Sequence, residues 1–379
     1  MADQRRISMA DIVIGEPLPW DAFGTDGKLL LRKGNIVVNE HQVQGLIDRG
    51  LYVNMHNGDS VHKQEAVKKL EIPSVLRLLN LVNKRLERLL YGLGGESDPQ
   101  AKFLEVVKAI IYATDLNRDI AVGCIQLNQS AGNYLARHSV DTAILALLVM
   151  RAMHKTPEEI GAVMAAALTM NIGMLRFQEQ LQDKQEPLSE KETDTVKKHP
   201  EVSVEILKQA GITNEAWLEH VLDHHENADG SGYPQGKTAA AISQNTKTLA
   251  LADHYCAALS IRKYRKTLPH AAALRDVFVS GGKVGDPMLA AYFIKELGTY
   301  PPGTFVRLDN GEVGVVTSRG AAPATPYVHA LVGPRGAPLS FPIKRDTAKP
   351  LHGIKEAIAN EQVTLRFSLH QLWGDEASL

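Results

Sequence analysis

The chain has 379 residues, with 42 Lys and Arg against 43 Asp and Glu, so its formal net charge is only −1. This balance excludes bulk electrostatic binding of a nucleic-acid polymer or an anionic membrane. The two cysteines form no CxxC pair, which excludes a disulfide framework. The apolar stretches at 144–153 and 160–177 are too short or too interrupted for a membrane span, and no secretory signal is visible, so we expect a soluble cytoplasmic protein. The 14 histidines are the unusual feature of the composition.

Residues 1–56 are predicted to form a small α/β domain. Apolar runs at 29–31, 36–38 and 51–53 are typical of short strands that are bounded by turn residues. A helix is predicted over 39–48, with an asparagine as its N-cap. Nothing in this segment indicates catalysis.

Residues 57–99 are predicted to be a polar linker followed by a helix. Pro73 opens this helix, and two glycines at 94–95 end it. Its apolar side chains follow a heptad-like spacing, at Val75, Leu79, Val82, Leu86, Leu89 and Leu93. Such a seam fits either packing within the helix's own domain or a homodimer.

The remaining chain divides into three parts. Residues 100–297 are rich in Ala, Leu, Ile and Val at helical spacing, which predicts a helical domain. A hairpin pattern and recurring Pro and Gly predict a small β module over 298–352. The tail, 353–379, shows no clear pattern. The expected fold class is therefore mainly α, with a small α/β domain before the helices and a small β module after them.

Four histidines stand out by their context. His138 lies in helical sequence, His199 precedes a proline, and His224 and His225 are adjacent. Further on, Asp253 lies in an apolar helix, where a carboxylate needs a partner. Imidazoles with a buried carboxylate are the ligand set of Zn, Fe, Mn or Ni. The residues by themselves fit either a metal centre or core histidines beside a structural turn.

The loop after the histidine pair is distinctive. Two glycines flank Ser231, and an aromatic residue and a proline follow, which gives a sharply turned loop suited to stacking on a nucleobase. The string HHENADGSGYPQG, at 224–236, resembles the signature of the HD-GYP family, which are bacterial HD-superfamily phosphohydrolases that cleave cyclic di-GMP. The resemblance extends over residues 131–297 and implies a helical HD-superfamily bundle. It also implies metal ions, commonly Fe or Mn, held by His138, His199, His224, His225 and Asp253.

Two ligands of the family are missing. The family has a His-Asp doublet followed by Ile-Gly-Lys, and the doublet here is Met170 and Asn171. An amide and a thioether cannot replace a carboxylate that bridges two cations. The lysine is replaced by Met174, so a cation facing the scissile phosphate is lost and no catalytic residue is assigned. We therefore expect reduced metal occupancy and impaired hydrolysis.

The ligand-recognition residues of the family are present. The resemblance implies substrate contacts from Gly232, Tyr233 and Pro234, with the tyrosine packed against a guanine. It also implies phosphate contacts from Arg262 and Arg265, because arginine can pair with a phosphate through two hydrogen bonds. The same loop, called the GYP loop below, resembles the family surface that contacts GGDEF-type cyclase domains.

Two functions follow from the resemblance. The first is an HD-GYP-family signalling protein that binds cyclic di-GMP or a partner protein and is impaired in catalysis. The alternative is an active, metal-dependent cyclic di-GMP phosphodiesterase with an unusual metal centre. A purely structural scaffold is a third hypothesis, which the recognition residues disfavour.

Overall fold

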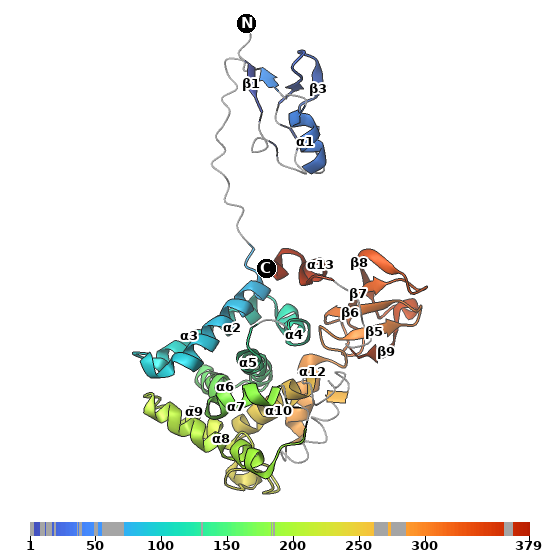
Figure 1. The fold of residues 1–379 in the computed structure, drawn as a ribbon. Helices are drawn as coiled ribbons and strands as arrows, with labels where there is room; N and C mark the ends of the chain where they lie inside the picture. The colour runs from blue at the N-terminus through green and yellow to red at the C-terminus, as the bar shows by residue number, and fades with distance from the viewer. Residues whose placement is uncertain are drawn as a thin grey trace. The chain divides into compact units, whose positions relative to one another are not determined.

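The chain forms two compact units in the computed structural model, Met1–Glu71 and Ile72–Leu379 (Figure 1). The structure describes residues 4–7, 12, 17–18, 20–35, 37, 40–48, 52–54, 72–129, 132–182, 184, 186–260, 272–273, 286–359 and 367–379. The predicted strand at 36–38 lies largely outside these residues.

The first unit is a small sheet with one helix. Its four strands are antiparallel in the order β1-β4-β2-β3. The elements are β1 (Gln4–Arg6), β2 (Ala22–Phe23), β3 (Leu29–Leu31), α1 (Glu40–Asp48) and β4 (Tyr52–Asn54). The predicted strand at 29–31 and the predicted helix up to Asp48 are confirmed. Buried Ile7, Ala22 and Val43 belong to a core of its own.

The second unit is a helical bundle around α5 (Tyr134–Ala152). Every α5 residue from 134 to 150 is buried, as expected for a helix at the centre of a bundle. The other helices are α2 (Val75–Gly92), α3 (Pro99–Leu116), α4 (Arg118–Leu127), α6 (Pro157–Thr169), α7 (Leu175–Gln182), α8 (Glu190–Gln209), α9 (Glu215–Asp223), α10 (Gln244–Leu259) and α12 (Pro287–Leu297). Short 3₁₀ turns are η2 (Leu93–Gly95), η3 (Ile172–Met174) and η4 (Ala239–Ala241). The predicted mainly α fold is confirmed.

Side-chain caps explain where several helices begin. Thr156 and Ser189 start α6 and α8 with complete capping boxes, in which Glu159 and Glu192 return a hydrogen bond to the cap backbone. Both helices therefore begin at the loops that the sequence marks by proline and serine.

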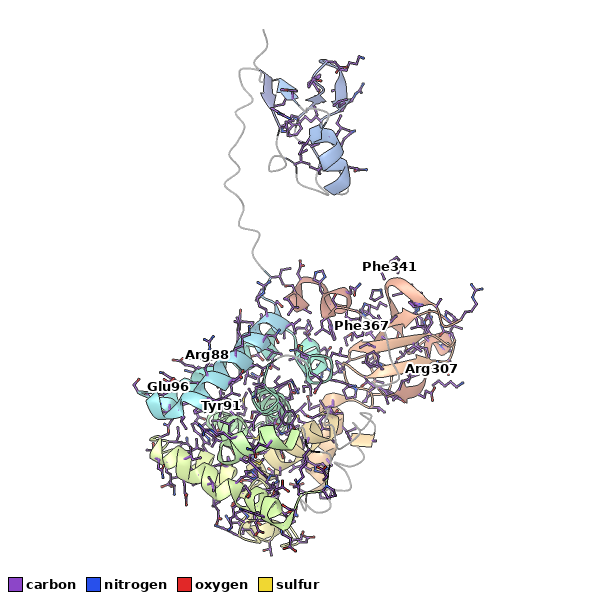
Figure 2. The ribbon with its side chains drawn as sticks, viewed as in Figure 1. Arg88, Tyr91, Glu96, Arg307, Phe341 and Phe367 are labelled. Atoms are coloured by element: carbon purple, nitrogen blue, oxygen red, sulfur yellow. The ribbon has the colours of Figure 1, made fainter. Side chains whose placement is uncertain are left out.

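The heptad-like seam of α2 packs inside its own unit. Leu79, Leu86 and Leu93 are buried in the main hydrophobic core. The opposite face of α2, with Arg88 and Tyr91, is exposed (Figure 2). Of the two packing modes that fit the seam, the structure has the one within the domain, and the homodimer stays a prediction.

The C-terminal sheet has five antiparallel strands in the order β8-β7-β6-β5-β9. Its elements are β5 (Phe305–Leu308), β6 (Val313–Ser318), β7 (Tyr327–Val332), β8 (Pro338–Asp346), η5 (Pro350–His352) and β9 (Ile354–Ile358). The predicted hairpin is confirmed as β5 and β6. One strand, β9, lies beyond residue 352, where the predicted module ends, because Ile358 pairs with Phe305.

The tail returns to the helical bundle through α13 (Leu369–Trp373) and η7 (Gly374–Ala377). Trp373 donates from Nε1 to the carbonyl of Thr317 at 2.9 Å, and its ring lies where a side chain on Gly123 would stand. The hydroxyl of Ser74 donates to the carbonyl of Ser378 at 2.5 Å. The sheet and the tail are therefore packed against the bundle as parts of one unit.

One helical stretch of 22 residues among the described ones, Pro157–Gln178, is long and apolar enough to cross a membrane. Its side chains from Val163 to Leu168 are all buried in the main core. This stretch is therefore a core element of the helical bundle.

Candidate metal centre

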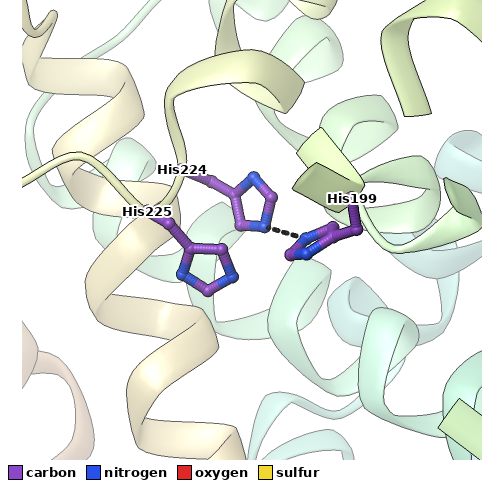
Figure 3. Close-up of side chains that lie close together, drawn as sticks. All are labelled: His199, His224 and His225. Carbon is purple, nitrogen blue, oxygen red and sulfur yellow. Dashed lines mark hydrogen bonds between the residues drawn. The ribbon is translucent and has the colours of Figure 1, made fainter. Parts of the chain in front are cut away.

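Three histidines from α8 and α9 form a cluster, called the three-histidine cluster below (Figure 3). His199 lies in the middle of α8, His224 is the C-cap of α9, and His225 follows it. One ring nitrogen from each histidine lies within 4.8 Å of the other two. The Nε2 atoms of His199 and His224 are 3.1 Å apart. These distances allow one cation to contact all three rings.

The hydrogen bonds of two rings fix their tautomers. His199 Nδ1 donates to the carbonyl of Val196 at 2.6 Å, and His224 Nδ1 donates to the carbonyl of Val221 at 2.7 Å. Because a carbonyl can only accept, each Nδ1 holds the proton and each Nε2 keeps a lone pair. Burial lowers the pKa of both rings and keeps them neutral.

Two lone pairs that face each other at 3.1 Å repel unless a cation lies between them. Metal-bound histidines usually donate their other ring nitrogen to a carbonyl or carboxylate, which is the arrangement found here. The donor set therefore fits a divalent metal ion.

The backbone turn before α7 supports His199. Ser203 Oγ donates to the carbonyl of Met170 at 2.7 Å and accepts from the backbone N–H of Gly173 at 2.9 Å. A Cβ on Gly173 would lie 2.5 Å from the carbonyl oxygen of His199. Only glycine allows this close approach of η3 and α8. No role for Ser203 could be predicted from the sequence, because its partners Met170 and Gly173 come from another part of the chain.

His138 and Asp253 form a separate pair. His138 Nε2 lies 2.7 Å from Asp253 Oδ1, and His138 Nδ1 is buried without a hydrogen-bond partner among the described residues. Burial favours a raised pKa for Asp253, but the hydrogen bond and charge of His138, with the charges of His225 and His224, outweigh it and hold the pKa below its usual range. The charge of Asp253 also acts on all three rings of the cluster.

The structure thus brings together three of the five predicted ligands and pairs the other two with each other. The assignment of all five as metal ligands stays a prediction.

Met170 and Asn171, the positions predicted to lack the His-Asp doublet, lie at the end of α6. Met170 is fully buried and belongs to the main core. Asn171 is 4% exposed, and Met174 is half-buried. Position 170 therefore has an apolar packing role, in keeping with a thioether side chain.

The GYP loop, which runs from Glu226 to Lys237, covers one side of the cluster. The ring centroid of Tyr233 is 4.7 Å from that of His225 and 6.4 Å from that of His199. Gly232 and Pro234 flank Tyr233 on this loop, whereas Arg262 and Arg265 lie outside the described residues. The loop also depends on Glu226 and Lys237, two residues to which the sequence analysis gave no role.

Comparison with known proteins identifies the central domain. Residues 123–283 match the HD domain family. The chain is 28% identical over 203 residues to a cyclic di-GMP phosphodiesterase of Borreliella burgdorferi. The aligned segment covers 53% of each of the two chains. It is 29% identical over 208 residues to a cyclic di-GMP phosphodiesterase of Pseudomonas aeruginosa, over 55% of this chain and 50% of the relative. A cyclic di-GMP phosphodiesterase response regulator of Xanthomonas campestris is 32% identical over 143 residues, 37% of each chain. The chain spans about half the length of the first two relatives.

A solved structure supports the same fold. An HDGYP protein of Bdellovibrio bacteriovorus superimposes with a TM-score of 0.51 and 13% identity, over 77% of this chain and 99% of that one. The match confirms the expected helical HD-type bundle. The domain profile, the curated relatives and this likeness in fold agree with the signature at 224–236. The helical domain therefore matches the HD domain family over residues 123–283, and its signature at 224–236 is similar to that of the HD-GYP type.

Proposed function

We propose that this protein is a metal-dependent phosphodiesterase that hydrolyses cyclic di-GMP. The observation that supports the proposal best is the three-histidine cluster, in which two lone pairs face each other at 3.1 Å and the third ring lies beside them. The relatives' names, cyclic di-GMP phosphodiesterases, suggest the substrate.

Each part of the site has a separate task in this proposal. His199, His224 and His225 would hold one divalent ion, and Fe and Mn are the ions that the family resemblance favours. When bound, such an ion supplies Lewis-acid activation of water and of the phosphodiester. Tyr233, whose ring lies beside the cluster, offers a face on which a guanine can stack.

Two arginines, Arg262 and Arg265, are proposed to pair with the phosphates of the dinucleotide. These few local cations suffice for a small dianion, although the chain has almost no net charge.

A second candidate function is binding of cyclic di-GMP without hydrolysis. Two observations favour it. Met170 and Asn171 offer no carboxylate at the doublet, and His138 Nε2 lies 2.7 Å from Asp253 Oδ1, so these two side chains partner each other. Because a two-metal centre stabilises both the attacking and the leaving oxygen, its loss lowers the rate more than the affinity.

One experiment separates the two candidates. The protein is purified without oxygen, stripped of metal and loaded with Mn²⁺ or Fe²⁺, and linear products of cyclic di-GMP are quantified by chromatography. Hydrolysis that falls about 100-fold or more in His224→Ala supports the phosphodiesterase. His370→Ala, an exposed histidine of α13, is the matched control and should leave turnover unchanged.

Two results would count against hydrolysis. Turnover that persists in His224→Ala rejects the three-histidine cluster as the reaction centre. Saturable binding without turnover favours the binding module.

A protein partner and a location are part of the proposal. The GYP loop exposes Ser231 and Gln235, so a GGDEF-type cyclase domain could dock on it in the cytoplasm. A homodimer is best checked by light scattering of the native chain, because Leu79 and Leu86 are core residues and polar substitutions there would unfold the bundle.

A further inference from the structure

The two ends of the GYP loop are joined by one carboxylate. Glu226 is 3% exposed, and its Oε1 accepts the backbone N–H of Gln235 at 2.6 Å. Its Oε2 accepts the backbone N–H of Lys237 at 2.8 Å. Hydrogen bonds to an ionised acceptor are shorter and stronger than neutral ones. Glu226 therefore closes the loop over the residues between it and Gln235.

An ion pair forms a second connection. Lys237 Nζ lies 2.6 Å from Asp223 Oδ2, and the side chain of Asp223 is fully buried. Asp223 is the last residue of α9 and directly precedes His224. The carbonyl of Asp223 also accepts the backbone N–H of Glu226 at 2.9 Å. The end of the GYP loop is thus bound to the same helix end that presents two histidines of the cluster.

The middle of the loop lies against the histidine backbone. A Cβ on Gly232 would lie 2.3 Å from the backbone nitrogen of Asn227 and 2.6 Å from the carbonyl oxygen of His225, so only glycine fits. The backbone N–H of Tyr233 donates to that same carbonyl at 3.2 Å. As a result, the ring of Tyr233 lies over the ring of His225, at 30° and with 4.7 Å between centroids.

We propose that Glu226 is the positioning residue that holds Tyr233 over the three-histidine cluster. The Lys237–Asp223 ion pair is the second connection that keeps the loop in place. Glu226 touches neither the ligand nor the metal. It fixes the aromatic face on which a planar base of the ligand stacks before the ligand arrives. The choice of cyclic di-GMP as the ligand rests on the proposed function, whereas the closed loop stands on the contacts above.

The test uses Glu226→Gln in the full chain, with Glu219→Gln as the control, because Glu219 is exposed on α9, the helix that ends just before the GYP loop. Hydrogen exchange of the backbone amides of Gln235 and Lys237 should become faster in Glu226→Gln and stay unchanged in the control. Cyclic di-GMP affinity should fall about tenfold, as expected when one base–aromatic stack is lost. Binding of Co²⁺ to the histidines, followed by its visible absorption, should remain.

Coupling to Tyr233 separates positioning from a merely structural role. Tyr233→Ala should weaken binding by a similar factor, and the double variant with Glu226→Gln should be no weaker than Tyr233→Ala alone. Additive losses, or unchanged affinity in Glu226→Gln, would overturn the proposal.

Two further measurements keep the outcome decisive. If Glu226→Gln does not fold, the double variant Asp223→Asn with Lys237→Met is used instead, because it removes the ion pair without leaving a buried charge. Hydrogen exchange of the backbone amides of the GYP loop must again become faster. If the native chain binds no cyclic di-GMP, the proposed function fails by itself. The exchange measurement then still decides whether Glu226 closes the loop.

Discussion

Replacement of Gly173 by alanine tests how η3 supports the histidine cluster. Gly173 lies on η3, at the point where this turn meets α8. An added Cβ would lie 2.5 Å from the carbonyl oxygen of His199, 2.7 Å from the nitrogen of Ser203 and 2.9 Å from its Oγ. Ordinary contacts of a Cβ lie at 3.4–4 Å. Two of the three atoms belong to a helical backbone, so η3 and α8 must move apart by about 1 Å.

The cost of this movement has two parts. Overpacking of a close contact costs about 1–3 kcal/mol. The same shift breaks the hydrogen bonds of Ser203 to Gly173 and to Met170, each of which contributes about 1 kcal/mol. We therefore expect the free energy of unfolding to fall by about 3–5 kcal/mol.

Urea unfolding followed by circular dichroism at the helix band measures this change. Gly161→Ala is the matched control, since Gly161 lies inside α6 and, apart from its chain neighbours and the backbone of its own helix, no atom lies within 4 Å of the added Cβ. Alanine there should stabilise the bundle by about 0.5–1 kcal/mol, because glycine is a poor residue for a helix interior. The two variants should thus shift stability in opposite directions.

Metal binding provides a second readout. Because His199 moves with α8, the affinity of the cluster for Co²⁺ should fall about tenfold or more in Gly173→Ala and stay constant in Gly161→Ala. If the free energy of unfolding of Gly173→Ala lies within about 0.5 kcal/mol of the native value, the close contact between η3 and α8 does not limit the size of residue 173, and the predicted strain is refuted.

Three further predictions follow from buried groups. Burial lowers the pKa of His220 from 6.5 to about 4, so the unfolded chain binds a proton at a higher pH than the folded chain does. The free energy of unfolding should therefore fall by roughly 3 kcal/mol as the pH falls from about 6.5 to about 4. In urea titrations at several pH values, His220→Gln should flatten this part of the curve of stability against pH. Arg345→Met should lower the free energy of unfolding by about 2–4 kcal/mol, because the buried carboxylate of Glu312 loses both hydrogen bonds from Arg345. Adding Glu312→Gln to this variant should recover most of the loss, as measured by thermal unfolding. The double substitution Met170→His and Asn171→Asp should raise the metal content measured by mass spectrometry; an unchanged content would show that the doublet is misassigned.

Local sequence determined most of the secondary structure. Helix starts were predictable where a capping side chain lies within three or four residues of its partner, as for Thr156 with Glu159 and Ser189 with Glu192. The loop at 229–236 was also predictable, because glycines and proline restrict the backbone directly. The three histidines of the cluster could be proposed from their place in a family signature, not from their spacing.

The tertiary structure decided the chemistry of the site. His199 and His224 are 25 residues apart, and only the packing of α8 against α9 brings their Nε2 atoms together. The pairing of His138 with Asp253 spans 115 residues, and the sequence alone placed both in one metal site.

The sequence by itself therefore determined the family resemblance, the helical fold and the candidate residues, because these follow from local patterns and motifs. The close approach of His199 to His224 and His225, and the closure of the GYP loop by Glu226, were decided only by the fold. Contacts between distant segments depend on how helices pack, and packing is set by the whole core at once. No local pattern contains that information.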